Sequence, residues 1–126
     1  MKIFDKFFRS KEETASPLMS SWEEIVAIMH DKYLDAFADE VVDVVYSKDK
    51  SMRYVVLKDE KGLFTFQLEA IYQFDEEEWK YICSSDNDLP AIWEPFRGII
   101  GRSFFENKNE LFKEMAEEPE YKRYFE

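Results

Sequence analysis

The sequence predicts an α+β fold in which an antiparallel, three- to four-stranded meander sheet packs against helices, with one layer of helix on the sheet. Residues 63–74 alternate between apolar and polar side chains, which is the two-residue period of a strand. Residues 22–37 instead place apolar side chains three and four positions apart, as an amphipathic helix does. Short polar turns separate the strand-like segments, so we expect consecutive strands to be antiparallel neighbours.

The chain of 126 residues fits one domain, residues 1–126, and is long enough to bury a core without metals or disulfides. Its 12 Phe, 7 Tyr and 3 Trp predict a core built largely from rings. Cys83 is the single cysteine, and residues 1–9 lack the apolar run of a signal peptide. We therefore expect a cytoplasmic protein, and no apolar run approaches the roughly 20 residues of a membrane span.

The net charge of −11 argues against nucleic acid as a partner, because phosphate backbones are repelled. The acidic residues gather in two segments. Residues 20–49 hold eight acidic and two basic side chains, and residues 75–98 hold seven acidic and two basic. Such surfaces suit a basic partner protein, a divalent cation or simple solubility, of which solubility is the commonest reason.

Residues 1–13 are predicted to form a short amphipathic helix, and residues 14–20 a linker to the rest of the domain, residues 21–126. Beside four cations, this helix carries Phe4, Phe7 and Phe8. The pattern fits an anchor on a membrane surface or on a partner protein. It also fits a helix docked on its own domain, which we favour because so short a helix is marginal in water unless it is packed.

The helix expected at residues 22–37 has a capping box, because Ser21 precedes Glu24 by three positions. Its apolar stripe consists of Trp22, Ile25, Val26, Met29, Tyr33 and Phe37. We expect this stripe to cover one face of the sheet. His30 is predicted to lie at the edge of the stripe, and with no second histidine or nearby cysteine it does not indicate a zinc site.

Three strands are predicted at residues 41–46, 53–58 and 63–74, and the turn before the third uses Gly62 at positive φ. A bend or bulge is expected near residues 69–70, because the third strand is unusually long. Its core face should carry Phe64, Phe66, Leu68, Ala70, Tyr72 and Phe74. Its solvent face should carry Thr65, Gln67, Glu69 and Gln73.

A short helix is predicted at residues 76–83, capped by Asp75 with Glu78 three positions on. Residues 79–82 also fit a strand, and periodicity over so few residues does not decide between them. A closing strand is predicted at residues 99–105. The chain then ends in a helix capped by Asn107, a stop at Pro119 and a last turn over residues 120–125.

Residues 84–101 are predicted to be a loop, because Pro90 and Pro95 oppose regular structure. The loop contains Ile92, Trp93 and Phe96 next to the acidic residues Asp86, Asp88 and Glu94. These apolar side chains either pack on the edge of the core, which we favour, or bind a partner protein. These six residues are therefore the candidate binding site.

No catalytic constellation is recognisable, since one cysteine, one histidine and scattered serines form no nucleophile motif. The three glycines do not make a phosphate-binding loop. We expect no catalytic residues, no cofactor and no metal site. An alternative is an enzyme that uses a divalent ion at residues 75–78, where four carboxylates follow one another.

The order of parts supports a resemblance. Residues 72–79 (Tyr-Gln-Phe-Asp-Glu-Glu-Glu-Trp), residues 89–93 (Leu-Pro-Ala-Ile-Trp) and the helical tail at residues 114–125 resemble small uncharacterised cytosolic proteins of Gram-positive bacteria. In build and acidity the chain is also similar to bacterial immunity proteins, which neutralise a basic toxin. The resemblance implies a non-enzymatic, protein-binding module of the immunity or regulatory type with a basic partner. The alternative is a peripheral membrane-surface accessory protein, and the oligomeric state stays open.

Overall fold

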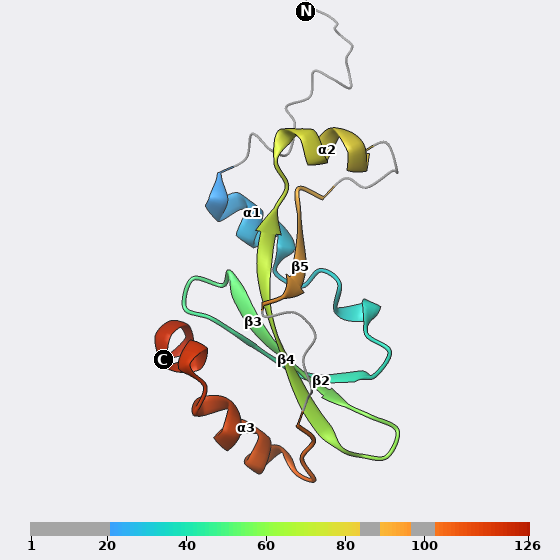
Figure 1. Ribbon diagram of the computed structural model, residues 1–126, viewed down its shortest axis with the longest axis vertical. Coiled ribbons are helices and arrows are strands. Elements are labelled where there is room, and N and C mark those ends of the chain that lie inside the picture. The colour runs from blue at the N-terminus through green and yellow to red at the C-terminus, as the bar shows by residue number, and fades with distance from the viewer. Residues whose placement is uncertain (1–20, 84–88, 97–102) are drawn as a thin grey trace, which may run out of the picture. The chain divides into compact units, whose positions relative to one another are not determined.

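The computed structural model describes residues 21–83, 89–96 and 103–126 (Figure 1). Its elements in chain order are α1 (Trp22–Met29), η2 (Leu34–Ala36), β2 (Glu40–Tyr46), β3 (Met52–Lys58), β4 (Phe64–Gln73), α2 (Glu76–Cys83), β5 (Ala91–Pro95), α3 (Lys108–Ala116) and η3 (Tyr121–Phe125). The four strands form one sheet in the order β2-β3-β4-β5. The predicted α+β class with an antiparallel sheet is confirmed.

The chain divides into two compact units, and each is described by itself. The first comprises residues 1–29 and 73–92, and the second residues 30–72 and 93–126. The helix predicted at residues 1–13 and the linker at residues 14–20 lie outside the described residues.

In the first unit, α1 begins at the predicted capping box. The amide of Ser21 donates to Oε1 of Glu24 at 2.8 Å, and the amide of Glu24 donates back to Oγ of Ser21 at 3.2 Å. The prediction of a helix continuing to residue 37 is wrong, because α1 ends at Met29. Tyr33 adopts a left-handed conformation with φ 67°, which no α-helix accommodates, and η2 is only a 3-10 turn.

The helix α2 in the same unit settles the alternative between helix and strand for residues 76–83. The amide of Glu78 donates to Oδ1 of Asp75 at 2.8 Å, and the amide of Asp75 donates to Oε1 of Glu78 at 2.9 Å. These two reciprocal hydrogen bonds satisfy amides at the start of the helix, whereas in a strand the amides would bond to a neighbouring strand. The three acidic residues of the first turn also favour the helix, because they lie at its positive end.

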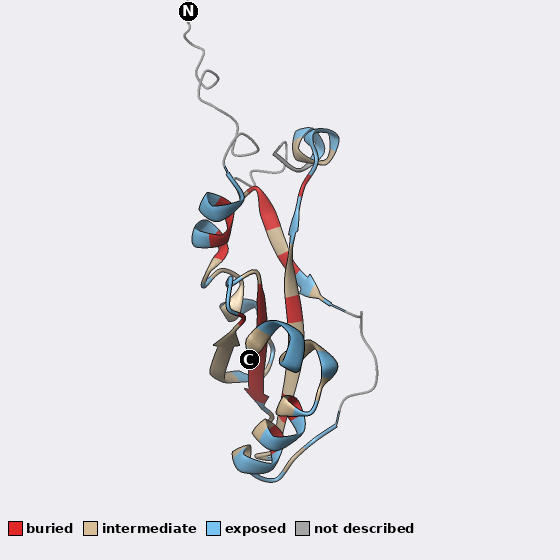
Figure 2. Cartoon of the chain, turned by 90° about the vertical axis from the view of Figure 1, so that its left-hand side faces the viewer, coloured by how far each residue is buried: buried red, intermediate tan, exposed pale blue. Residues whose placement is uncertain are grey.

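In the second unit, β3 is the central strand, and all but its last residue are buried (Figure 2). Its antiparallel ladder with β4 runs without interruption from Lys58 opposite Phe64 to Met52 opposite Ala70. The bulge expected near residues 69–70 is therefore absent from this ladder. The irregularity lies in β2 instead, between Val41 and Asp43.

One face of this sheet packs against the C-terminal helices. Tyr54 and Val56 of β3 form a buried cluster with Leu111 and Met115 of α3. Phe64, Phe66, Leu68, Tyr121 and Phe125 are partly buried against the same cluster. We expected the helix at residues 22–37 to provide this cover, but in the second unit α3 and η3 provide it.

The opposite face of β4 was predicted to be exposed to solvent, and this prediction is wrong for Thr65 and Glu69. They are only 1% and 5% exposed. Oγ1 of Thr65 donates to the main-chain oxygen of Ser103 at 2.9 Å, and Glu69 pairs with an arginine, so both polar groups are satisfied. Tyr72, predicted to lie in the core, is 38% exposed, whereas Phe74 is buried.

The loop predicted at residues 84–101 contains a fourth strand, β5, which is a correction. Pro90 and Pro95 lie at its two ends on the outer edge of the sheet, where a missing amide costs no ladder bond. The described hydrogen bonds between this segment and β4 or the residue that follows it do not need an amide of either proline. The amide of Phe74 donates to the oxygen of Pro90, and the amide of Phe96 donates to the oxygen of Leu68.

The closing strand predicted at residues 99–105 is not found where the structure describes the segment. Residues 97–102 lie outside the description, and residues 103–105 contribute one isolated antiparallel bridge, Phe105 opposite Phe64. The predictions for the C-terminal helix and last turn are confirmed. Oδ1 of Asn107 accepts the amide of Glu110 at 2.9 Å and so caps α3, and η3 supplies the expected last turn.

Candidate functional site

The predicted binding residues of the aromatic loop have different environments. Trp93 is buried at 7% exposure, Ile92 is partly buried, and Phe96 is 42% exposed beside the exposed Glu94. Asp86 and Asp88 lie outside the described residues, as do the three phenylalanines Phe4, Phe7 and Phe8. The described loop is therefore packed inward at Trp93 and open to solvent at Phe96.

Trp93 is buried because β5 places its ring against a charged side chain of β3. The guanidinium carbon of Arg53 lies 4.1 Å from the centroid of the Trp93 ring, a cation–π arrangement. Tyr46 meets the same ring edge-on, with the centroids 6.4 Å apart. This geometry makes Trp93 part of the interior and leaves little of it for a partner.

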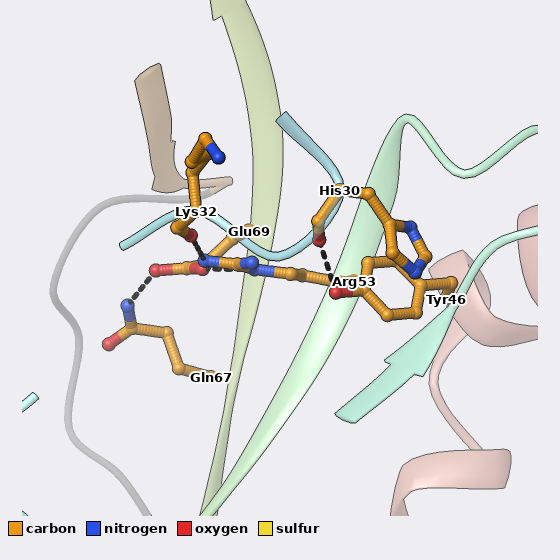
Figure 3. A network of polar contacts seen from close by, with 6 residues as sticks. All are labelled: His30, Lys32, Tyr46, Arg53, Gln67 and Glu69. Carbon is orange, nitrogen blue, oxygen red and sulfur yellow. Dashed lines mark hydrogen bonds and ion pairs between the residues drawn. The ribbon is translucent and has the colours of Figure 1, made fainter. Parts of the chain in front are cut away.

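The side chains around Arg53 form a polar row across three strands (Figure 3). Tyr46 of β2 lies opposite Arg53 of β3, which lies opposite Glu69 of β4. Nε of Arg53 donates to Oε1 of Glu69 at 2.8 Å, and Nη2 donates to the main-chain oxygen of Lys32 at 3.0 Å. Nε2 of Gln67 donates to the second carboxylate oxygen of Glu69 at 2.9 Å. The ion pair is thus dry and extensively hydrogen-bonded.

His30 joins the end of this row through its ring and its main-chain oxygen. Its ring stacks on that of Tyr46, with centroids 4.1 Å apart and planes inclined by 20°. The hydroxyl of Tyr46 donates to the main-chain oxygen of His30. Carbonyls that follow the end of a helix lack helical donors, and here side chains of the sheet supply them. His30 therefore acts through its ring and its backbone.

Almost every polar group in the row has a partner. Both carboxylate oxygens of Glu69 accept hydrogen bonds, one from Arg53 and the other from Gln67. Nη1 of Arg53 is the exception, because it is buried without a hydrogen-bond partner. Arg53 was not singled out from the sequence. Counting back from the turn at Gly62 would have placed it opposite Glu69, as in the observed register.

Asp49 organises the turn between β2 and β3. Its Oδ1 accepts the hydroxyl of Ser47 at 3.0 Å, and the amide and hydroxyl of Ser51 at 3.0 and 2.7 Å. The hydrogen bonds from Ser51 are the main reason that the pKa of Asp49 lies below its ordinary value. The turn also places Lys50 at φ 67°. This carboxylate has a structural role.

The structure offers no support for a metal centre or a membrane-spanning helix in the part of the chain that it describes. Within residues 21–83, 89–96 and 103–126, no three His, Cys, Asp or Glu side chains are grouped to hold a metal ion. In the same ranges, no helix has the length and apolar character needed to cross a bilayer.

The most exposed large apolar side chain in the described ranges lies on α2. Tyr81 is 82% exposed. It follows Glu77 by four residues and Glu78 by three, so the helical period places the three residues on the same side of α2. We call Glu77, Glu78 and Tyr81 the α2 surface. The sequence contained this signal, because the same period places Tyr81 nearly opposite Trp79 on the helix.

The fold and these surfaces define a small acidic α+β protein with a four-stranded antiparallel sheet. Comparison with protein-family models, curated proteins and solved structures finds no significant match.

Proposed function

We propose that the protein is a non-enzymatic binding module that engages a basic partner protein through the α2 surface. The observation that carries the proposal is the 82% exposure of Tyr81 on a helix whose first turn holds three glutamates. An exposed tyrosine is effective in an interface, because a large rigid ring becomes buried with little loss of side-chain entropy.

The chemistry of the surface selects a basic partner. A lysine or arginine side chain can place its cation over the face of the Tyr81 ring while Glu77 and Glu78 supply opposite charge. The net charge of −11 would further raise the rate of encounter with a basic protein. An immunity-type role, with a basic toxin as partner, is the specific form that the resemblance favours.

Affinity capture with matched variants tests this proposal. The full chain is immobilised and exposed to an extract of the producing cell at low and at high salt, and the retained proteins are identified. We expect a basic protein that elutes with salt, is lost with Tyr81→Ser and is retained more weakly with Glu77→Gln, which leaves the cap formed by Asp75 and Glu78 unchanged. Tyr124→Ser is the control, because Tyr124 is also exposed but lies on η3.

The outcome also decides between α2 and the aromatic loop. Loss of the partner with Phe96→Ser, but not with Tyr81→Ser, would move the interface to the loop predicted from the sequence. Retention of the same proteins by every variant, or of no basic protein at all, would contradict the proposed function. Circular dichroism of each variant confirms that the fold is retained.

A further inference from the structure

Residues 30–37 form the first part of the connection between α1 and β2, and we call them the strap. Two main-chain oxygens attach the strap to the polar row of the sheet (Figure 3). The oxygen of His30 accepts the hydroxyl of Tyr46, and the oxygen of Lys32 accepts Nη2 of Arg53. The donors of both bonds are side-chain groups, so breaking the bonds leaves the backbone hydrogen bonds between the strands intact.

The backbone of the strap has little regular structure of its own. Tyr33 takes a left-handed conformation with φ 67°, which is unfavourable for a residue with a β-carbon. η2 is a single 3-10 turn, in which the amide of Ala36 donates to the oxygen of Tyr33 at 3.2 Å. Short 3-10 turns have poor hydrogen-bond geometry. The strap therefore depends on its attachments to the sheet.

The closed strap leaves one donor unsatisfied. Arg53 is fully buried, and its Nη1 has no hydrogen-bond partner although Nε and Nη2 do. A buried donor without a partner loses the hydration it would have in water. Opening of the strap would exchange the bond to Lys32 for bonds to water and would also hydrate Nη1. Opening of the strap consequently costs less free energy than the number of broken hydrogen bonds suggests.

We propose that the strap opens locally, as a unit, while β3 and β4 remain paired, and that it gates the access of water to the Arg53 guanidinium. Arg53 and Glu69 stay on paired strands in the open form, where the water that enters competes with Glu69 for the Nε–H of Arg53. Such partial opening below the free energy of global unfolding is common where side-chain bonds, rather than ladders, hold a segment.

Hydrogen exchange of the Arg53 side chain, measured by NMR on the full chain, tests the gate. The Nε–H of Arg53 is buried and bonded to Glu69, so it exchanges only after water enters. We expect its protection factor, corrected for the intrinsic exchange rate, to be at least about tenfold lower than those of the β3 backbone amides.

Two variants locate the gate. Tyr46→Phe removes the bond to the His30 oxygen but keeps the ring stack, and His30→Ala removes the stack but keeps the oxygen. Each should lower the protection of the Arg53 Nε–H several-fold and leave the β3 amides unchanged, whereas Tyr124→Phe should change neither. Equal protection of Arg53 and β3 in the wild-type protein would overturn the proposal. So would a low protection of Arg53 to which both variants are indifferent, because water would then enter elsewhere.

Discussion

The most unusual feature at the scale of single residues is that Arg53 and Glu69 form an ion pair in the buried interior. Two apolar residues of similar size would fill the same space without the desolvation of two charges. The pair lies directly across the β3–β4 ladder. A slip of one residue between β3 and β4 would leave the two charges on opposite faces of the sheet, each without its partner, so the pair penalises alternative registers. Its value therefore lies in specificity as much as in stability.

Removal of one member of the pair should be far more damaging than removal of both. Glu69→Leu leaves the Arg53 charge buried and is expected to lower the free energy of unfolding by about 3–5 kcal/mol. The double variant Arg53→Met with Glu69→Leu should recover most of that loss. Urea denaturation measures both. Additive effects of Glu69→Leu and Arg53→Met would contradict the coupling.

Asp49 should make stability depend on pH in the acid range. Because its pKa is lowered in the folded protein, its contribution is fully present above the unfolded value and is lost as pH falls through the folded one. We expect Asp49→Asn to reduce the urea midpoint at pH 7, and the difference from the wild-type protein to shrink below about pH 3.8. Asp35→Asn is the control on an exposed carboxylate. A difference that grows at low pH would contradict the assignment.

Among the elements, β2 shows how one extra residue changes which side chains meet the core. Strict alternation would place Val42 and Val45 on opposite faces, but both pack against the cluster around Tyr54. The irregularity between Val41 and Asp43 accounts for this. Oδ1 of Asp43 also accepts the amide of Val44 at 2.9 Å, which blunts the outer edge of the sheet against pairing with another chain.

The cap of α3 offers a quantitative test at the scale of an element. Asn107→Ala removes the acceptor of the Glu110 amide and should lower the free energy of unfolding by about 1 kcal/mol. Asn107→Ser retains a capping oxygen and should cost much less. Thermal and urea unfolding of both variants provide the measurement. Equal losses would show that the cap does not account for the effect.

Charge dominates the behaviour of the whole molecule. A net charge of −11 on a chain of this size repels itself, and salt screens repulsion over about 10 Å at 0.1 M. We therefore expect Tm to rise by several degrees between 20 and 200 mM sodium chloride. Salt should weaken the ion pair of Arg53 and Glu69 very little, because the pair is buried away from the ions, so the pair does not offset the rise of Tm.

A charge variant provides the control for the salt effect. The variant combines charge reversals at two exposed glutamates, Glu60→Lys and Glu114→Lys. Each substitution raises the net charge by two units, so the variant carries −7 instead of −11. The variant should show a smaller rise of Tm with salt than the wild-type protein. A fall of Tm with salt in the wild-type protein would mean that attractive surface pairs outweigh the repulsion.

Most of the elements could be predicted from the sequence, whereas their burial could not. The caps at Ser21, Asp75 and Asn107 were recognisable because in each a side-chain oxygen accepts the backbone amide three residues further along the chain. The candidate site was harder to predict. Trp93 and Phe96 look equivalent in the sequence, yet one packs under Arg53 and the other reaches solvent.

The sequence by itself determined the fold class, the segments of β2, β3 and β4 and the turns between them, because period, propensity and capping act between near neighbours. Tertiary structure alone decided that the polar face of β4 is buried, that α1 ends early and that α3 covers the sheet. The reason is distance along the chain. Arg53 meets Glu69 sixteen residues away and Lys32 twenty-one residues away, and no local pattern announces which distant groups will satisfy a buried charge.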